Sequence, residues 1–380
     1  MKTRWFKYIL PALLLSAACS DDKPEADDSH VLVMFMAGYN NLSGNIATNI
    51  ELELTKGSLP AKGSSNAIVI FSHCSPYAME GHRYKSTQQY DVPTQPVLIR
   101  AYSEGGKAVL DTLKRYPTDF DYTDPDNLNS VLTEIADRFP ASRYGLLYSS
   151  HGTGWLPADD TVKTRAIGAR FHKSQWNMRE TDIRDFAAAL PVHFDYIIMD
   201  ACYMGAVEVV YQLRDCCDCM VVSETEIPAD GFDYARLPQR LFASDRPNLE
   251  QICNDYMVRT SVGGTVALVR TAELEDLAAQ VAQLGGIPDT LDRSSVQKMG
   301  CSSEYRYFYD MQDIFGGRLD LSRVVLMEQH TPEFNAMAPL KIDRCCGLSM
   351  YLPLEEDTLI NSYYRTLDFC RDAHLPGDRK

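Results

Sequence analysis

Short hydrophobic runs, bounded by polar or turn-forming residues, recur along the chain from residue 31 onward. Runs of this length are typical of strands buried in a parallel sheet, and they cover residues 31–36, 67–71, 145–150, 196–199, 220–223, 264–270 and 347–352. Segments with apolar residues at helical spacing lie between them, at residues 44–55, 126–139, 180–190, 204–214, 248–260 and 272–284. This order predicts an α/β fold: a mostly parallel central sheet flanked by helices on both faces. Residues 76–92 and 97–99 are predicted as a hairpin of polar edge strands.

Two of these strands are followed at once by residues that can do chemistry. The run at 145–150 is followed by His151 and Gly152, and the run at 196–199 by Asp200, Ala201 and Cys202. Ligands in open α/β sheets bind beyond the carboxyl ends of the strands, so His151 and Cys202 are expected at the same edge. The helical pattern after Cys202 places its thiol at a strand-to-helix junction, where the helix N-terminus favours the thiolate.

A thiol beside a histidine predicts nucleophilic catalysis. His151 takes the proton of Cys202 and later returns it to the leaving group, while the backbone N–H groups of Gly152 and Cys202 are the expected oxyanion donors. A glycine suits position 152 because a side chain there blocks the approach of those donors. The alternatives are a structural histidine and an inert buried thiol.

The N-terminal segment has the pattern of an export signal. Lys2, Arg4 and Lys7 precede an apolar core at residues 8–15, and small residues lead to Cys19. This pattern resembles a bacterial lipoprotein signal, with Cys19 as the lipidated residue; an ordinary cleaved signal is the alternative. The apolar run is too short for a transmembrane anchor.

The chain is therefore divided into a signal peptide at residues 1–18, a lipidated polar tether at 19–30 and one domain at 31–380. Residues 20–23 resemble the acidic tags of surface-exposed outer-membrane lipoproteins, so the cell envelope is the predicted location. The net charge of −15 argues against a nucleic-acid partner and favours basic substrates.

The cysteines do not form a recognisable metal motif. The chain has 11 cysteines, and removing Cys19 and Cys202 leaves an odd number that cannot pair fully within one chain. The cluster Cys216, Cys217 and Cys219 lacks a matching second pair of ligands. No metal site is predicted; buried thiols or occasional disulfides are the expected state, also for the Cys345–Cys346 pair.

The same residues carry a resemblance to a known family. His151-Gly152 after one hydrophobic block and Asp200-Ala201-Cys202 after the next resemble the clostripain family of cysteine peptidases, in the wider group of caspases, legumains and gingipains. Asn40-Asn41-Leu42 resembles the turn after the family's first strand, although Gly38-Tyr39 stands where an acidic residue is usual. Residues 223–226 and 347–353 also resemble family segments, so the likeness covers about residues 31–360.

The resemblance implies an endopeptidase that cleaves after basic residues, Arg first and then Lys. In the family, the aspartate two residues before the nucleophile lies at the floor of the pocket for that residue, which here is Asp200. Asp230, in the carboxylate-rich loop at 224–233, is the expected second acid. The alternatives are a structural acid for Asp200 and a solvated loop acid for Asp230.

The segment at residues 156–179 has no hydrophobic periodicity and is predicted as a long exposed loop. Family members mature by cleaving themselves after a basic residue in the corresponding linker, which implies Lys163 or Arg165 here; a plain surface loop is the alternative. The resemblance requires no cofactor, and calcium stays open because some family members respond to it.

Two other functions remain open at this point. One is a surface lipoprotein that acts as a binding scaffold on a degenerate peptidase fold, which the departure at Tyr39 keeps open. The other is an amidase or acyl transferase that uses the same two residues. The expected partners are proteins or peptides with exposed Arg or Lys, together with the membrane through Cys19.

Overall fold

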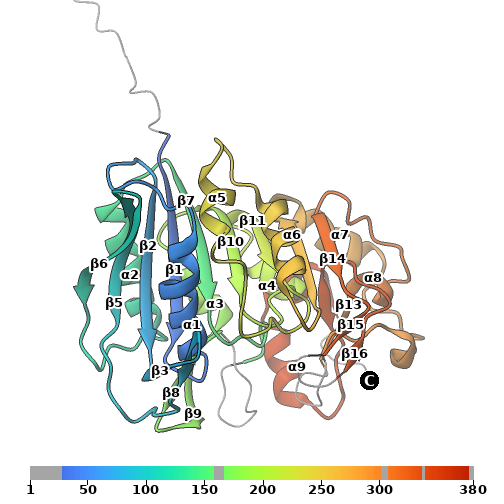
Figure 1. Cartoon of the computed structure of the whole chain (residues 1–380). Helices are drawn as coiled ribbons and strands as arrows, with labels where there is room; N and C mark the ends of the chain where they lie inside the picture. Colours follow the sequence, from blue (N-terminus) through green and yellow to red (C-terminus); the bar gives the residue numbers. More distant parts are fainter. Residues whose placement is uncertain (1–27, 158–166, 301–306, 336–338, 376–380) are drawn as a thin grey trace, which may run out of the picture.

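A nine-stranded mixed sheet forms the centre of the computed structural model (Figure 1). The structure describes residues 28–157, 167–300, 307–335 and 339–375. The strands lie in the order β14-β12-β11-β10-β7-β1-β2-β5-β6. The predicted α/β class is confirmed, with parallel strands in the middle of the sheet and antiparallel strands at both edges.

The five central strands are parallel and almost wholly buried. They are β1 (His30–Gly38), β2 (Ala67–Cys74), β7 (Arg143–Ser149), β10 (Phe194–Asp200) and β11 (Cys217–Val222). Every residue of β1 is buried, because helices cover both faces of the sheet and an uninterrupted apolar run is the pattern that such a strand requires. All five were predicted as strands.

The edge strands are antiparallel. They are β5 (Val97–Glu104) and β6 (Lys107–Arg115) at one edge, and β12 (Thr265–Arg270) and β14 (Val325–His330) at the other. The predicted hairpin is wrong in its pairing: β3 (Tyr77–Glu80) pairs with β4 (Arg83–Ser86), while β5 pairs with β2 and β6. β14 was not predicted, although an apolar run at residues 324–327 leads into it; all its residues are only half-buried and its second half is polar.

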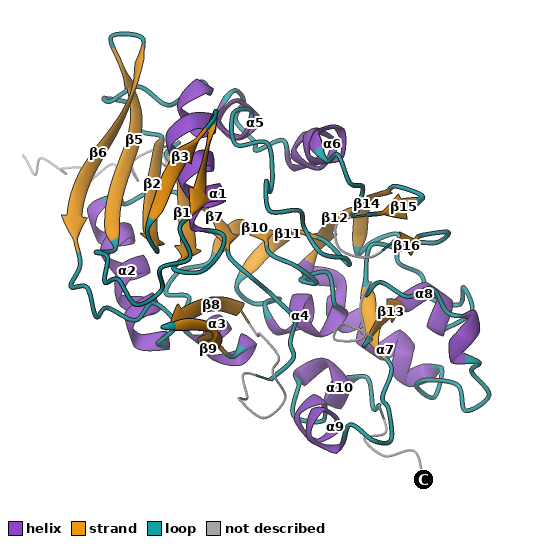
Figure 2. Ribbon diagram, turned by 60° about the horizontal axis from the view of Figure 1, so that its bottom comes forward, coloured by secondary structure: helices purple, strands orange, loops and turns teal. Residues whose placement is uncertain are grey.

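Helices cover both faces of the sheet (Figure 2). Odd-numbered residues of β1 such as Phe35 pack with one set of helices, and even-numbered residues such as Met34 pack with the other. The first set is α2 (Pro125–Arg138), α3 (Ile183–Ala188), α4 (Val207–Gln212), α7 (Leu274–Gln283), α8 (Met311–Ile314), α9 (Thr358–Tyr364) and α10 (Asp368–Asp372). The second set is α1 (Ser43–Thr48), α5 (Leu237–Phe242) and α6 (Leu249–Arg259).

The helix α2 shows how the sequence sets these elements. The side chain of Asp124 accepts hydrogen bonds from the first backbone N–H groups, and Pro125 starts the helix with its fixed φ. Its buried residues are Leu128, Val131, Leu132 and Ile135, one apolar stripe at helical spacing. The helix therefore lies with this stripe on the sheet.

Two further predictions are wrong. The run at 347–352 forms β17 (Ser349–Tyr351), which pairs with β13 (Phe308–Asp310) in a small separate sheet and not in the central one. The predicted exposed loop at 156–179 contains a hairpin of β8 (Ile167–His172) and β9 (Ser174–Thr181). All of β8 except its last residue is buried.

Contacts from distant parts of the chain hold this hairpin in place. The backbone N–H of Phe171 donates to the carbonyl of Tyr39, and the side-chain amide of Asn40 donates to the carbonyl of Ala169 at 2.7 Å. Another short hairpin pairs β15 (Glu333–Phe334) with β16 (Leu340–Lys341). Over the described ranges, no helix is both long and apolar enough to cross a membrane.

Candidate active site

Four adjacent parallel strands end at the same edge of the sheet, and the loops that follow them lie close together there. Met36 of β1 and Asp200 of β10 both lie level with Ser149 of β7, so these three strands end together. The loops that follow β1, β7, β10 and β11 carry Asn41, His151, Cys202 and Glu226. The predicted meeting of His151 and Cys202 at one sheet edge is what the structure shows.

These loops enclose a cavity of about 450 Å³. Its lining includes both His151 and Cys202, together with the carboxylates Asp200 and Glu226. The side chain of Ile46 from α1 also lines it. The cavity therefore combines a thiol, an imidazole and acidic groups in one accessible space.

The imidazole of His151 is held by an amide. Its Nε2 lies 2.6 Å from Oδ1 of Asn41, and its ring lies parallel to that of Phe171 with the centroids 6.0 Å apart. An amide oxygen can only accept, so this contact places a hydrogen on Nε2. Asn41 was noted in the sequence only as part of a resembling turn; its role as the partner of His151 was missed, because the two residues lie 110 positions apart.

Gly152 packs directly against the turn that carries Cys202. A β-carbon at this position would lie 2.8 Å from the carbonyl oxygen of Cys202 and 3.1 Å from the β-carbon of Ala201. The backbone N–H of Gly168 also donates to the carbonyl of His151, which joins this turn to β8. Close backbone approach is thus the physical reason for glycine here.

The thiol of Cys202 is held by the loop after β11. The backbone N–H of Ile227 donates to Sγ at 3.4 Å, and Sγ lies 3.8 Å from the carbonyl oxygen of Ile227. The predicted position directly at a helix N-terminus is wrong, because α4 begins only at Val207 after a run of turns. The hydrogen bond to Cys202 thus comes from the backbone N–H of Ile227 and not from the first turn of α4.

The turn after Cys202 is strained. Tyr203 has a φ of +60°, which is uncommon for a residue with a side chain. Its backbone N–H donates to the carbonyl of Thr225 at 3.0 Å, and the N–H of Gly205 donates to the carbonyl of Ser223 at 2.7 Å. These bonds to the loop after β11 fix the conformation that presents Cys202 to the cavity.

Asp200 is a buried carboxylate at the cavity wall. It is 6% exposed and accepts hydrogen bonds from Ser149 at 3.0 Å and Tyr234 at 2.5 Å. Burial raises the pKa of Asp200 to about 6, although both hydroxyl donors act to lower it. Gly231, at a φ of +62°, leaves the space that Asp200 needs, since a β-carbon would lie 2.4 Å from its Oδ2.

Comparison with known proteins identifies the family. The sequence profile of the clostripain family, Peptidase C11, matches residues 34–313. The chain belongs to this family. A curated relative, clostripain from Hathewaya histolytica, is 23% identical over 293 residues. The match covers 72% of this chain and 51% of the relative, so the chain spans about half the length of that clostripain.

Solved clostripain-family structures have the same fold. An inactive zymogen C11 protease from Parabacteroides distasonis is 26% identical, with a TM-score of 0.74. A secreted C11 cysteine protease from Bacteroides thetaiotaomicron, solved with an irreversible peptide inhibitor, is 23% identical with a TM-score of 0.75. Each comparison covers 92% of this chain and 99% of the other. The predicted membership of a cysteine-peptidase family is confirmed.

Asp230, the candidate second acid, is not among the residues that line the cavity. Its carboxylate forms a two-point ion pair with the guanidinium of Arg83 on β4, with one contact at 2.9 Å, and its side chain is 46% exposed. The Arg83 guanidinium holds the pKa of Asp230 below its usual range. The cavity is instead lined by Glu226, whose Oε1 accepts from the hydroxyl of Tyr203 at 3.1 Å.

Tyr39, which departs from the clostripain pattern, has a structural role. It is 4% exposed, and its hydroxyl donates to the carbonyl of Val92 at 2.7 Å. The guanidinium of Arg170 lies 5.1 Å from the centre of its ring. Tyr39 therefore fills a buried site and connects the loop before β5 to β8.

Three predicted residues lie outside the described part of the chain. They are Lys163 and Arg165, the candidates for self-cleavage, and Cys19, the candidate for lipidation.

Proposed function

We propose that the protein is a cysteine endopeptidase that cleaves after Arg, and less readily after Lys, with Cys202 as nucleophile and His151 as its proton partner. The observation that carries this proposal is the cavity at the carboxyl ends of β7 and β10, which both residues line. Clostripain-family membership supports the same chemistry.

The proposed reaction uses the two nitrogens of His151 differently. Asn41 accepts the hydrogen of Nε2, so Nδ1 is the nitrogen that takes the proton of Cys202. The thiolate then attacks the scissile carbonyl and forms a tetrahedral intermediate. His151 returns the proton to the leaving amine, and water hydrolyses the resulting thioester. No cofactor enters these steps, and a response to calcium stays open.

The developing oxyanion is assigned to the backbone N–H groups of Gly152 and Cys202. The close packing of Gly152 on the Ala201–Cys202 turn supports this, because it brings two backbone segments to one point. Donors fixed before the reaction stabilise the oxyanion without reorganisation in the transition state.

Recognition of a basic side chain is assigned first to Asp200. It is the buried carboxylate at the cavity wall, and a guanidinium forms strong paired hydrogen bonds with such a group. Asp230 remains the second candidate; it engages a substrate only when Arg83 releases it. Glu226 lines the cavity in its place and adds negative charge there.

Maturation and location complete the proposal. Cleavage after Lys163 or Arg165 by the protein itself would leave a fragment that ends at one of these residues, and lipidation would add acyl chains to Cys19. Mass spectrometry of protein from the native host and of a Cys202→Ala variant tests both. If the protein cleaves itself, the cut is found in the native protein and is absent from the Cys202→Ala variant. If the signal peptide is removed but Cys19 carries no lipid, the segment is an ordinary secretory signal and the predicted lipid anchor is wrong.

The proposed activity is tested with fluorogenic peptides that end in Arg, Lys, Asn, Asp or Ala. Arg-selective hydrolysis that is lost in Cys202→Ala supports both the nucleophile and the pocket. Hydrolysis after a different residue would keep Cys202 and reject Asp200 as the recognition group. If no peptide is cleaved, even after nicking of the 158–166 segment by trypsin, the binding-scaffold function takes its place.

A further inference from the structure

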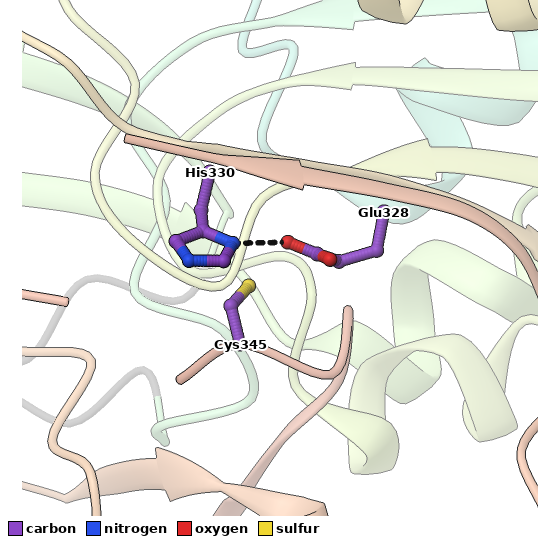
Figure 3. Close-up of side chains that lie close together, drawn as sticks. All are labelled: Glu328, His330 and Cys345. Carbon is purple, nitrogen blue, oxygen red and sulfur yellow. Dashed lines mark hydrogen bonds and ion pairs between the residues drawn. The ribbon is translucent and has the colours of Figure 1, made fainter. Parts of the chain in front are cut away.

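A second cluster of thiol, imidazole and carboxylate groups lies away from the cavity. Glu328 and His330 occupy β14 with one residue between them, so both side chains point to the same face of this edge strand. Cys345 approaches from the loop before β17, and all three side chains point toward one another (Figure 3). One potential ligand atom of each lies within 4.8 Å of the others.

The cluster is extended by a buried carboxylate from a fourth segment. Glu224 follows β11 and is 1% exposed, and its Oε1 accepts from the thiol of Cys345 at 2.9 Å and from the backbone N–H of Gly347 at 2.7 Å. Its other oxygen, Oε2, is buried and makes no hydrogen bond. A buried carboxylate oxygen with no donor is costly, and a bound cation removes that cost.

Acidic side chains outnumber basic ones around the cluster. Glu224, Asp310 and Glu328 gather here, and none of them forms an ion pair with a lysine or arginine in the described ranges. His330 is the nearest basic group, with its Nδ1 2.6 Å from Oε1 of Glu328. Like charges that share a poorly hydrated site repel each other, so the arrangement favours an added positive ion.

We propose that Glu328, His330 and Cys345, with Glu224 as the fourth ligand, bind a divalent transition-metal ion, with Zn²⁺ as the best fit. Zinc takes four ligands from thiolate, imidazole and carboxylate groups, whereas calcium and magnesium take oxygen ligands. Zn–S and Zn–N bonds of about 2.0–2.3 Å place neighbouring ligand atoms roughly 3–4 Å apart. The ligand atoms of Glu328, His330 and Cys345 already lie within 4.8 Å of one another. Binding releases the proton of the Cys345 thiol to solvent.

The neighbouring group of Glu224, Asp310 and Cys346 is the less suitable site. Asp310 already caps α8 by accepting from the N–H of Asp313, and it also accepts from the N–H of Cys346 at 2.6 Å. The thiol of Cys346 donates to the carbonyl of Leu348 at 3.1 Å. Asp310 and Cys346 are therefore satisfied by the protein, and Cys346 serves as a matched control for Cys345.

The metal would join three segments that the backbone brings together. β14 and the loop at 345–347 pack closely, because a β-carbon at Gly347 would lie 2.8 Å from a side-chain methyl of Val325. Glu224 stands between Ser223 and Thr225, whose carbonyls hold the turn after Cys202. A bound metal would therefore cross-link β14 and the loop at 345–347 to the loop after β11, which supports the cavity. This proposal does not depend on the proposed peptidase activity.

The test uses the Cys202→Ala protein, which removes the thiol of the cavity as a competing ligand. The protein is freed of metal with a chelator, loaded with Zn²⁺ or Co²⁺ and separated from excess ion. We expect one equivalent of bound zinc by elemental analysis, and a thiolate-to-cobalt absorption band in the Co²⁺ form. Adding Cys345→Ser removes both signals, whereas adding Cys346→Ser keeps them.

A second variant keeps the test decisive where Cys345→Ser does not fold. His330→Gln has the size of the original side chain and lies on a half-buried edge strand. It lowers the zinc affinity by at least about tenfold, with an unchanged circular dichroism spectrum. Absence of bound metal in Cys202→Ala, or equal retention in the Cys345→Ser or His330→Gln proteins, overturns the proposal.

Discussion

Two regions of this molecule bring a cysteine and a histidine together, and they are built in opposite ways. His151 and Cys202 follow parallel strands in the middle of the sheet and face a cavity. His330 and Cys345 belong to an antiparallel edge strand and a neighbouring loop, and carboxylates surround them. The partner of His151 is the neutral amide of Asn41, whereas the partner of His330 is the carboxylate of Glu328.

Residue types alone do not define a nucleophile. A reactive thiol needs access for substrate, a proton partner and donors for the charge that develops. Cys202 has a cavity and the backbone N–H of Ile227. Cys345 instead donates to Glu224, and burial beside that carboxylate raises the pKa of its thiol far above the usual range. One site is suited to attack and the other to holding a cation.

The largest expected effect separates the two cysteines. Cys202→Ala lowers kcat/KM for an Arg peptide by at least about 10⁴-fold, because the nucleophile is lost. Cys345→Ser lowers kcat/KM by less than about tenfold, because it can affect the cavity only indirectly, by changing the position of the loop after β11. Steady-state hydrolysis of one fluorogenic peptide by both variants measures this. Equal losses would mean that the comparison between the two sites is wrong.

The carboxylates of the cavity give the next largest effect. Asp200→Asn lowers kcat/KM for Arg peptides by about 10- to 100-fold, the value of a hydrogen-bonded charge. Asp230→Asn has a smaller effect, because Arg83 already balances the charge of Asp230. An Ala peptide serves as the control substrate for both variants. A larger loss in Asp230→Asn would restore Asp230 as the main recognition group.

We expect Asn41 to contribute to catalysis by holding the imidazole of His151 in one orientation. Asn41→Ala lowers kcat by about tenfold or more with little change in KM, because the imidazole loses the bond that fixes its tautomer. The matched control is Asp218→Asn, which removes the exposed partner of His193, 2.9 Å from its Nε2. We expect that variant to keep the kcat of the original protein. A change in KM alone for Asn41→Ala would assign Asn41 to substrate binding.

The smallest effect is a pH dependence of recognition. Burial raises the pKa of Asp200 to about 6, so the carboxylate is charged above that pH and gains a proton below it. Recognition of Arg therefore weakens as the pH falls, and kcat/KM for Arg peptides decreases by up to about tenfold per unit below pH ~6. The pH profile of kcat/KM for Asp200→Asn lacks this decrease at low pH. If both proteins show the same decrease, a group other than Asp200 causes it.

The sequence predicted the central strands and the meeting of His151 and Cys202 at one sheet edge because that information is local. An apolar run followed by His151-Gly152, or by Asp200-Ala201-Cys202, marks a strand and its end without reference to the rest of the chain. The contacts of Asn41 with His151 and of Ile227 with Cys202 join residues 110 and 25 positions apart. No periodicity encodes such contacts, so these roles could not be predicted.

The errors have different origins. In β8, the apolar residues Ile167, Ala169 and Phe171 alternate with other residues, but this short pattern was overlooked in a segment predicted as a loop. Tyr39 and Asn40 form hydrogen bonds to this strand from a distant part of the chain. Asp230 was proposed for the pocket because it lies in the carboxylate-rich loop after β11. Its ion pair with Arg83 comes from a hairpin whose approach nothing in the sequence marks. The cluster of Glu328, His330 and Cys345 likewise has no motif, since its ligands come from β14 and a separate loop.

The most direct test of the account is covalent labelling with an irreversible electrophile that carries an Arg side chain. The intact protein is treated at neutral pH, digested and analysed by mass spectrometry to locate the modified sulfur. We predict a single label, on Cys202. The Asp200→Asn substitution should slow the labelling reaction, and an electrophile with an Ala side chain should label Cys202 only weakly. A label on Cys345, or equal labelling of several cysteines, would contradict it.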